Sequence, residues 1–512
     1  MTSAHFGIRP APLAAVGWAL LASFALCFGI ASALLPGYLV FSLLLVPVVA
    51  AVLLVRPEYG LTACIAFVCG LIHPALVPRI AVLGGSLAAA DATLAMLAVY
   101  AVWEFLAHSG KLKAPPASVA GTRFLATAAS LFAASLLFSI AVSLMLRDIP
   151  QAWALGETRS LLYVLVLPIA VVILRRQERQ DRFVVSLVVL GGLFSVGQVL
   201  QGVFGIPVFG DSGISALETL GRQETATTRA NTLGLNVIIF SLLLTIGAHV
   251  LHLIRKPLFL AVAGLLFVGI VLTYGRTTFA TVLISIAVLV WWLNPKKIPQ
   301  LALLMVVFVA IGSALALYWK PDSFAAVIYR LTSVGEELDH GYSAQWRYWE
   351  FEAMLPHVQE HPLIGIGLGA DYKGVAGSSL RPELNRYMHN AYMSMAGKMG
   401  LPALLFFLLS MAAIFSVGRR LARSDVVPWS RLVGAASAAM MIRFLFASVT
   451  EPHFMSDYGV VSIATAGALA YLGAHRAMPV AGPKASCKTL LSSVPSLQQE
   501  PGALQQVELS LG

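Results

Sequence analysis

Charged residues are scarce in this sequence. Of its 512 residues, 11% are Asp, Glu, Lys or Arg and 58% are hydrophobic. An average soluble domain has about 25% charged and about 45–50% apolar residues, so the composition excludes a soluble globular protein. Short segments of alternating polarity, which a transmembrane β-barrel requires, are also missing. The sequence instead contains repeated apolar runs near 20 residues, the length that an α-helix needs to cross a bilayer.

Cysteine is rare as well. The chain has four, Cys27, Cys64, Cys69 and Cys487, and no two of them form a CxxC pair. This pattern indicates neither a disulfide framework nor a zinc knuckle. A cleaved signal sequence is not predicted either, because the apolar run 13–35 is followed at once by another and is typical of a first membrane span.

Fourteen apolar runs are candidate transmembrane helices. They predict an all-α polytopic membrane protein with about 12–14 transmembrane helices. The run at 59–76 is the weakest, because His73, Pro74 and Pro78 crowd its end. The fourteen runs are 13–32, 37–55, 59–76, 85–107, 122–145, 160–174, 183–203, 231–254, 257–275, 277–293, 300–319, 400–417, 432–449 and 458–474.

Lysine and arginine predict the orientation, because short cytoplasmic loops carry an excess of both. With a cytoplasmic N-terminus, every basic cluster falls on the cytoplasmic side, which explains the net charge of +10 without nucleic acid as a partner. We therefore expect a multi-pass protein of a bacterial inner membrane with both termini in the cytoplasm. The clusters are Lys111/Lys113/Arg123, Arg175/Arg176/Arg179/Arg182, Arg255/Lys256, Lys296/Lys297 and Arg419/Arg420/Arg423/Arg431.

This orientation places two polar segments outside, in the periplasm. The longer one, 320–398, is the only long polar stretch between the predicted spans, and the shorter one is 201–230. The tail 475–512 is rich in Ser, Pro, Gln and Gly and is predicted to be disordered. The polar residues of the two outer segments that we take as candidates for chemistry are Arg222, Arg229, Arg347, Arg386, His389 and Asn390.

Two further arginines lie next to or within predicted spans. Arg276 interrupts about 37 otherwise apolar residues at the outer face. It is either an interfacial anchor that snorkels to lipid head groups or a fixed cation for a phosphate-bearing lipid. Arg443 lies inside the span 432–449, where an ionised residue is costly and usually faces a polar cavity or a partner. Its alternative role is a structural ion pair with Glu451 or Asp457.

His389 opens the stretch HNAYMSMAGKM, which leads into the span at 400–417. A histidine titrates near neutral pH, so His389 is a candidate general base for an attacking hydroxyl. The alternative is a solvated loop histidine without a catalytic role.

Two patterns in the long loop suggest other chemistry. His357, Glu360 and His361 match H-x-x-E-H, the inverted zinc-protease pattern. Pro362 stops the helix there and no third ligand is placed nearby, so we expect no metal. The glycines of 365–369 lack the spacing of a nucleotide-binding loop and instead predict a tight turn with positive φ.

The combination of these pieces resembles the bacterial superfamily of O-antigen ligases and Wzy-type O-antigen polymerases, which are membrane glycosyltransferases. The resemblance extends over about 220–415. It is carried by TTRANTLG at 227–234, TYGRTTFA at 273–280, QWRYWEFEAMLPHVQEHPLIGIGLG at 345–369 and HNAYMSMAGKMGLPALLFF at 389–407.

The resemblance implies a GT-C-like helical fold that acts on a glycan carried by undecaprenyl diphosphate, without metal, nucleotide sugar or other cofactor. It implies that His389 is the base or orients the acceptor, and that Arg276 and Arg347 bind the diphosphate with help from Arg229. Asn390 and Arg386 are further substrate-binding candidates. Arg222 and Arg443 have no secure counterpart in the family, and their candidacy depends on charge and burial alone.

We accordingly expect N-terminal transmembrane helices in 1–219, an O-antigen ligase- or polymerase-like membrane domain in 220–474, and a cytoplasmic tail in 475–512. The expected function is polymerisation of exopolysaccharide or O-antigen repeat units. The alternatives are an O-antigen ligase of lipopolysaccharide synthesis, which transfers glycan to lipid A-core, and a polysaccharide flippase or transporter. Expected partners are the lipid-linked glycan, a glycan or lipid A-core acceptor, membrane lipids, and chain-length regulator and export proteins.

Overall fold

The computed structural model confirms a helical, polytopic membrane protein. Within the residues that it describes, seven helices are long and apolar enough to cross a membrane, and two shorter apolar helices accompany them. The predicted spans 13–32 and 37–55 and the tail beyond 477 lie outside these residues. The described residues are 55–72, 79–82, 85–108, 120–209, 214–219, 222–230, 232–273, 275–319, 342–373 and 385–477.

The long apolar helices fall where the sequence predicts spans. They are α4 (Ala89–His108), α5 (Ala120–Ala141) continued by η3 (Val142–Leu146), α6 (Gln151–Leu162) continued by η4 (Tyr163–Leu165) and α7 (Val166–Ile173), α8 (Gln177–Phe204), α11 (Arg276–Leu293), α17 (Leu401–Arg423) and α18 (Pro428–Ala447). The two shorter ones are α9 (Leu235–Val250) and α10 (Lys256–Val271). Helices α12 (Ile298–Trp319) and α19 (Asp457–Arg476) match the predicted spans 300–319 and 458–474.

The span predicted at 59–76 is shorter than expected. Helix α3 (Pro57–Val68) has 12 residues, or about 18 Å at 1.5 Å per residue, which is less than the hydrocarbon thickness of a bilayer. Gly70, at φ +69°, ends the helical segment in a left-handed turn. The apolar residues after that turn therefore do not extend α3.

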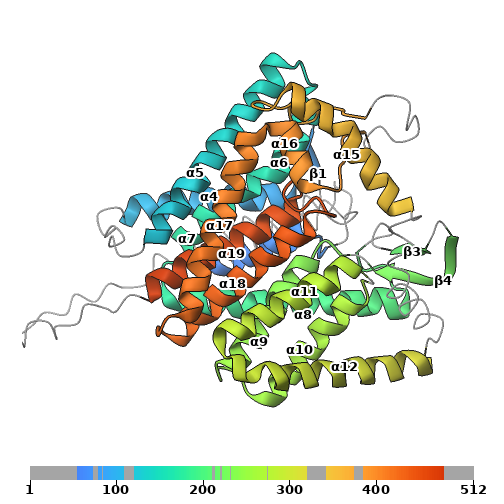
Figure 1. Cartoon of the computed structure of the whole chain (residues 1–512). Helices are drawn as coiled ribbons and strands as arrows, with labels where there is room; N and C mark the ends of the chain where they lie inside the picture. The colour runs from blue at the N-terminus through green and yellow to red at the C-terminus, as the bar shows by residue number, and fades with distance from the viewer. Residues whose placement is uncertain are drawn as a thin grey trace, which may run out of the picture.

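Helices α17 and α18 form the centre of the bundle (Figure 1). Their backbones touch, since a Cβ on Gly418 would lie 2.4 Å from the Gly434 carbonyl oxygen. Small residues at such a crossing are the usual means by which membrane helices approach closely. Helix α5 packs on α17, while α11 and α19 pack on α18. The helices before and after residue 220 therefore share one hydrophobic core.

The outward-facing side chains of the bundle are apolar. Helix α8 shows this most clearly, with exposed Val185, Val189, Leu193 and Val196 at intervals of three or four residues. A stripe of this kind would be unfavourable in water and is typical of a helix face in contact with lipid.

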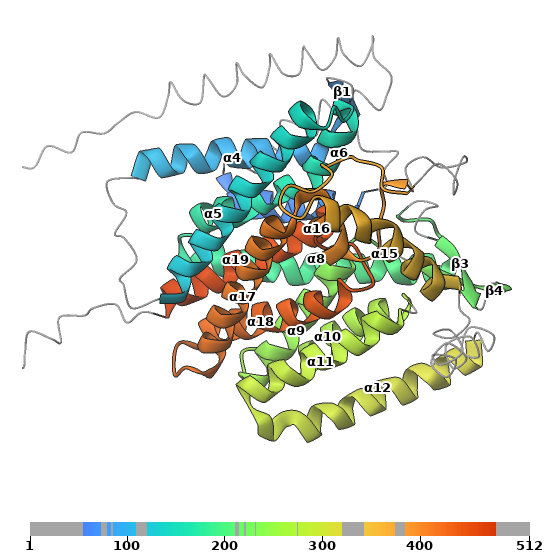
Figure 2. The ribbon, with the colours of Figure 1, turned by 45° about the horizontal axis from the view of Figure 1, so that its top comes forward.

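Two short antiparallel hairpins interrupt the helical pattern, and neither was predicted. The first pairs β1 (Arg79–Val82) with β2 (Gly85–Ala88), and the second pairs β3 (Ile214–Thr219) with β4 (Arg222–Ala230). The second hairpin lies at the same end of the molecule as α15 (Tyr342–Glu360) in both views (Figures 1 and 2).

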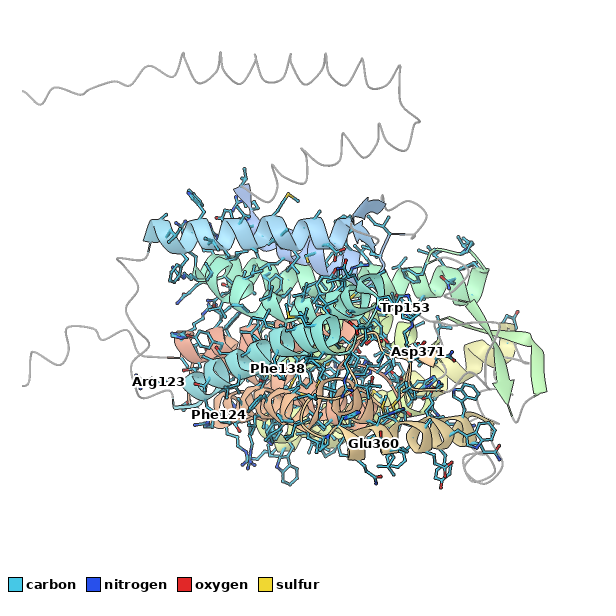
Figure 3. The ribbon with its side chains drawn as sticks, turned by 90° about the horizontal axis from the view of Figure 1, so that it is seen from above. Arg123, Phe124, Phe138, Trp153, Glu360 and Asp371 are labelled. Atoms are coloured by element: carbon cyan, nitrogen blue, oxygen red, sulfur yellow. The ribbon has the colours of Figure 1, made fainter. Side chains whose placement is uncertain are left out.

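Among the described residues, the predicted basic clusters lie at the opposite end of the bundle. Arg476 pairs with Asp181 at 2.6 Å, and Arg431 donates to the Leu293 carbonyl at 3.2 Å. Figure 3 shows Arg123 at the start of α5 and Trp153 beyond the other end of that helix. The structure thus separates the basic connections from the end that contains α15 and α16 (Ala391–Met399).

Candidate active site

His389 and Glu350 form a close pair. Glu350 lies on α15, and His389 directly precedes Asn390, the N-cap residue of α16. The His389 Nδ1 atom lies 3.0 and 3.1 Å from the two Glu350 carboxylate oxygens, and the His389 backbone N–H donates to the same carboxylate at 2.9 Å. One third of the His389 side chain is exposed, whereas Glu350 is 2% exposed. A buried carboxylate on one ring nitrogen fixes the orientation of an imidazole whose other nitrogen remains available for chemistry.

Three groups hold Glu350 in its ionised form. Besides His389, Trp346 Nε1 donates to it at 3.0 Å and Lys373 Nζ at 2.9 Å. Burial would raise the pKa of Glu350, but the hydrogen bonds from His389 and Lys373 outweigh burial and lower it to about 2. Glu350 is therefore a permanent anion at neutral pH. Sequence analysis did not single out Glu350, because its partner His389 lies 39 residues away in the chain.

This shift predicts a pH-dependent contribution of Glu350 to stability. A carboxyl group whose folded-state pKa is depressed stabilises the fold fully above its ordinary pKa of 4.5, and the effect is lost as pH falls towards about 2. The Tm difference between the unmodified protein and Glu350→Gln should thus be constant between pH 7 and 5 and shrink below pH 4.5. Thermal unfolding in detergent across this range measures it. A difference that grows towards acid would contradict the assignment.

Asn390 caps α16 and fixes the direction in which that helix starts. Its side-chain oxygen accepts from the backbone N–H of Tyr392 at 3.0 Å and of Met393 at 3.1 Å. Asparagine is among the preferred residues at this position. The contacts give Asn390 a positioning role for His389, in addition to the substrate contact that the sequence predicts.

The segment after α18 contacts both the predicted motif around Arg276 and the predicted motif around His389. The Ala391 backbone N–H, two residues after His389, donates to the Ser448 carbonyl at 2.9 Å. Thr450 Oγ1 lies 3.4 Å from the hydroxyl of Thr277, the neighbour of Arg276. The structure therefore brings the predicted motifs around 276 and 389 to one place, at the end of α18.

Arg276 is the first residue of α11 and is half-buried. A helix N-terminus carries a partial positive charge, so a cation there does not stabilise the helix. The same arrangement is favourable for an anion, which meets the guanidinium and the free N–H groups together.

Arg347 lies one helical turn before Glu350 on α15 and is half-buried. Its charge acts on Tyr387, whose ring lies 5.0 Å from that of His389. Burial raises the pKa of Tyr387 to about 12, Glu350 and Glu451 add to the rise, and Arg347 opposes it. Arg347 thus acts electrostatically on a neighbour of His389, and its role in binding the diphosphate stays a prediction.

The glycine turn at 365–369 is confirmed. Gly365, Gly367 and Gly369 have φ values of +68°, +100° and +83°. A side chain at Gly365 or Gly369 would collide with backbone atoms at about 2.5 Å, so only glycine fits there. The turn lies against α16, since the backbone N–H of Gly367 donates to the Lys398 carbonyl at 3.0 Å.

A buried ion pair below this turn was missed by sequence reasoning. Lys398, which is 2% exposed, contacts Glu157 of α6, and Glu157 also accepts from the Gly369 backbone N–H at 2.9 Å. Residues 241 positions apart carry no sequence signal for such a pair. The pair joins α6 to the helix that follows His389.

The Arg386 side chain contacts two other residues of the protein. Its guanidinium lies 4.2 Å from the centre of the Trp153 ring and its Nε lies 3.3 Å from Asp371 (Figure 3 labels both partners). Its carbonyl accepts from Lys398 Nζ at 2.7 Å. These contacts indicate that Arg386 helps to fold the loop around His389.

The other predicted residues come from β4 and α18 rather than from the segments that contain His389 and Glu350. Arg222 and Arg229 are on β4, opposite Thr219 and Ser215 of β3, and their side chains lie outside the described part of the structure. Arg443 is on α18 and is fully buried. For the H-x-x-E-H pattern, α15 ends at Glu360, and no group of three or more His, Cys, Asp or Glu side chains within the described residues could hold a metal ion.

Residues 261–408 match the family model described as O-antigen ligase. Over this region the chain is similar to the O-antigen ligase-like superfamily. No curated protein matches the chain. The O-antigen ligase-like region includes Arg276, Arg347 and His389, and it also includes Glu350, which the sequence analysis did not single out. The matched region is narrower than the predicted resemblance of 220–415 and leaves out Arg222 and Arg229. Arg443 lies outside both ranges.

The O-antigen ligase-like region does not contain the whole site. The Ser448 and Thr450 contacts come from the end of α18, and the Glu157 contact comes from α6. Helices on both sides of the matched region therefore support the residues inside it.

Proposed function

We propose that this protein is a membrane glycosyltransferase that uses an undecaprenyl-diphosphate-linked glycan as donor. The observation that supports it most directly is the His389–Glu350 pair, whose segment contacts Ser448 after α18, while Thr450 two residues further contacts Thr277 in the first turn of α11. The match to the O-antigen ligase family supports the same reaction type. The site lies in the periplasm in this proposal, with the basic clusters and both termini in the cytoplasm of a bacterium.

The proposed reaction is a displacement at the anomeric carbon of the donor. The oxygen of an acceptor hydroxyl forms a bond to that carbon, and the bond from the carbon to the diphosphate oxygen breaks. The hydroxyl proton passes to His389 Nε2, since Nδ1–H is donated to Glu350. The lipid diphosphate leaves as an anion, which Arg276 and Arg347 stabilise. Every group in this scheme comes from the chain, so no metal or cofactor is required.

Glu350 acts in this scheme as a positioning residue. Because it stays ionised, it selects the tautomer of His389 with the proton on Nδ1 and stabilises the imidazolium that forms. Asn390 supports the same geometry through the cap of α16. Arg386 likewise supports the loop around His389. Arg222 and Arg229 are proposed to contact the glycan or its carrier.

Polymerisation of exopolysaccharide or O-antigen repeat units is the specific activity we propose. The hairpin β3–β4 supports it, because its arginines form a second basic segment at the α15 end of the molecule, suited to a second lipid-linked glycan. A ligase would instead transfer the finished glycan to lipid A-core. In this proposal 220–474 is the catalytic membrane domain, 1–219 adds supporting helices, 475–512 is a tail, and chain-length regulator and export proteins are partners.

The glycan phenotype of a deletion strain tests this proposal. Loss of a polymerase should leave glycans of a single repeat unit, which a plasmid with the unmodified gene restores to long chains. Long chains that accumulate on the carrier lipid would show a ligase instead. Unchanged glycans, or repeat units trapped on the cytoplasmic face as in the loss of a flippase, would refute a periplasmic glycosyltransferase.

A further inference from the structure

The Arg443 guanidinium is a buried cation that forms no hydrogen bond with the residues that the structure describes. It is 0% exposed, and none of its three nitrogens has a hydrogen-bond partner among the residues that the structure describes. Its guanidinium carbon lies 5.4 Å from the centre of the Phe444 ring. Glu451 acts on it through charge alone, and a carboxylate oxygen of Glu451 lies 2.9 Å from His453 Nε2. No described residue therefore accepts a hydrogen bond from the five N–H groups of the Arg443 guanidinium.

Such an arrangement does not stabilise the fold. Removing a guanidinium from water costs several kcal/mol, which is recovered only when the buried charge is well paired and hydrogen-bonded. A structural arginine on the same helix shows the contrast, because half-buried Arg431 donates to the carbonyls of Ala422 and Leu293. No described side chain thus supplies a hydrogen-bond partner for Arg443.

Arg443 lies near the end of α18 that leads into Ser448 and Thr450, the residues that contact the segments around His389 and Arg276. It is in the last turn and a half of α18, five residues before Ser448, the residue whose carbonyl accepts from Ala391. Thr450, two residues further, contacts Thr277 beside Arg276. The Asn236 side-chain oxygen, on the neighbouring α9, is likewise buried and without a partner among the described residues. Asn236 Nδ2 lies 3.5 Å from the carbonyl of Tyr458.

We infer that Arg443 is a second anion site, which binds a phosphate group of a polyprenyl-linked glycan when the end of α18 opens. This inference rests on the proposed function and adds to it a cation separate from Arg276 and Arg347. Phosphate matches the site because its oxygens accept several hydrogen bonds and suit the planar fork of a guanidinium. The phosphate belongs either to the donor or to the acceptor lipid, and the chemistry is the same.

Ligand-induced stabilisation of the full-length protein tests the inference. The Tm is measured in detergent with undecaprenyl diphosphate, and with undecaprenol as the control for the lipid tail. Arg443→Met should have an equal or higher Tm without ligand, because an unpaired charge is removed. It should bind undecaprenyl diphosphate roughly tenfold to hundredfold more weakly, the effect of losing hydrogen bonds to a charged group. Arg443→Lys keeps the charge without the fork and should fall between the two.

Arg431→Met is the matched control, an arginine replaced on the same helix. It leaves two carbonyls without a donor and should lower the Tm, while the ligand-induced shift stays as large as in the unmodified protein. A shift retained in Arg443→Met but lost in Arg276→Met would overturn the inference and leave the proposed function intact. If undecaprenyl diphosphate does not stabilise the unmodified protein, both fail.

Steady-state transfer assays then identify the source of the phosphate. In Arg443→Met the KM for the donor lipid rises if the donor phosphate binds here, and the KM for the acceptor lipid rises if the acceptor phosphate does. Unchanged KM values for both would overturn the inference.

Discussion

Replacement of His389 by alanine is expected to abolish glycan transfer. A positioned general base contributes about 10²–10⁴-fold to a rate, and His389 is the only imidazole that the structure, in its described part, places on the Glu350 carboxylate. The kcat of the purified enzyme should therefore fall by about that factor, with little change in KM because the arginines remain. A time course with a fluorescent lipid-linked donor measures the loss.

Two controls separate this prediction from zinc chemistry and from misfolding. Glu360→Ala, at the end of α15, should keep full activity, and EDTA should have no effect. The Tm of His389→Ala should stay within a few degrees of that of the unmodified protein, since one third of the side chain is exposed. Activity retained in His389→Ala would refute His389 as the base. Activity lost in Glu360→Ala together with EDTA sensitivity would transfer the catalytic role to the H-x-x-E-H pattern.

The helices were predictable because their signal is local. The length and apolar content of runs such as 122–145 and 183–203 are sufficient to predict α5 and α8, since a bilayer imposes both properties on each helix separately. The hairpin β3–β4 was missed although ETATTRA in β4 contains three threonines, which are common in strands. Strand preference depends on pairing with a partner, and a single segment does not reveal that partner.

The site was predictable only in part, for the same reason. His389 and Arg276 could be chosen as ionisable residues near predicted spans, and Arg347 from the motif in 345–369 that carries the family resemblance. Glu350 could not, because it looks like any charged residue of an exposed helix until the fold brings His389 against it. The only local signal for Glu350 was Trp346 four residues earlier, whose side-chain N–H donates to the Glu350 carboxylate. Arg443 was found from its position inside a span, where the cost of an ionised group is itself a signal.

Arg276→Ala is expected to show the second large effect, a fall in kcat/KM of about 10²–10³. This is the usual effect of removing a group that stabilises developing charge, here the charge on the departing diphosphate. At the start of α11 the guanidinium adds to the field of the helix N-terminus, so its removal weakens the attraction for an anion. Arg276→Lys should recover part of the activity, because it restores the charge without the bidentate geometry.

Product inhibition distinguishes this role of Arg276 from an anchoring role at the membrane surface. Free undecaprenyl diphosphate should inhibit Arg276→Ala less strongly than the unmodified enzyme, because the leaving group and the inhibitor carry the same diphosphate. The Tm should change little, since a cation at the positive end of a helix does not stabilise it. An arginine that only anchors α11 in lipid head groups would give the opposite pair of results, a lower Tm and unchanged inhibition. Arg347→Ala is the companion variant, and because Arg347 comes from α15 rather than α11, its loss should weaken inhibition without any effect on the start of α11.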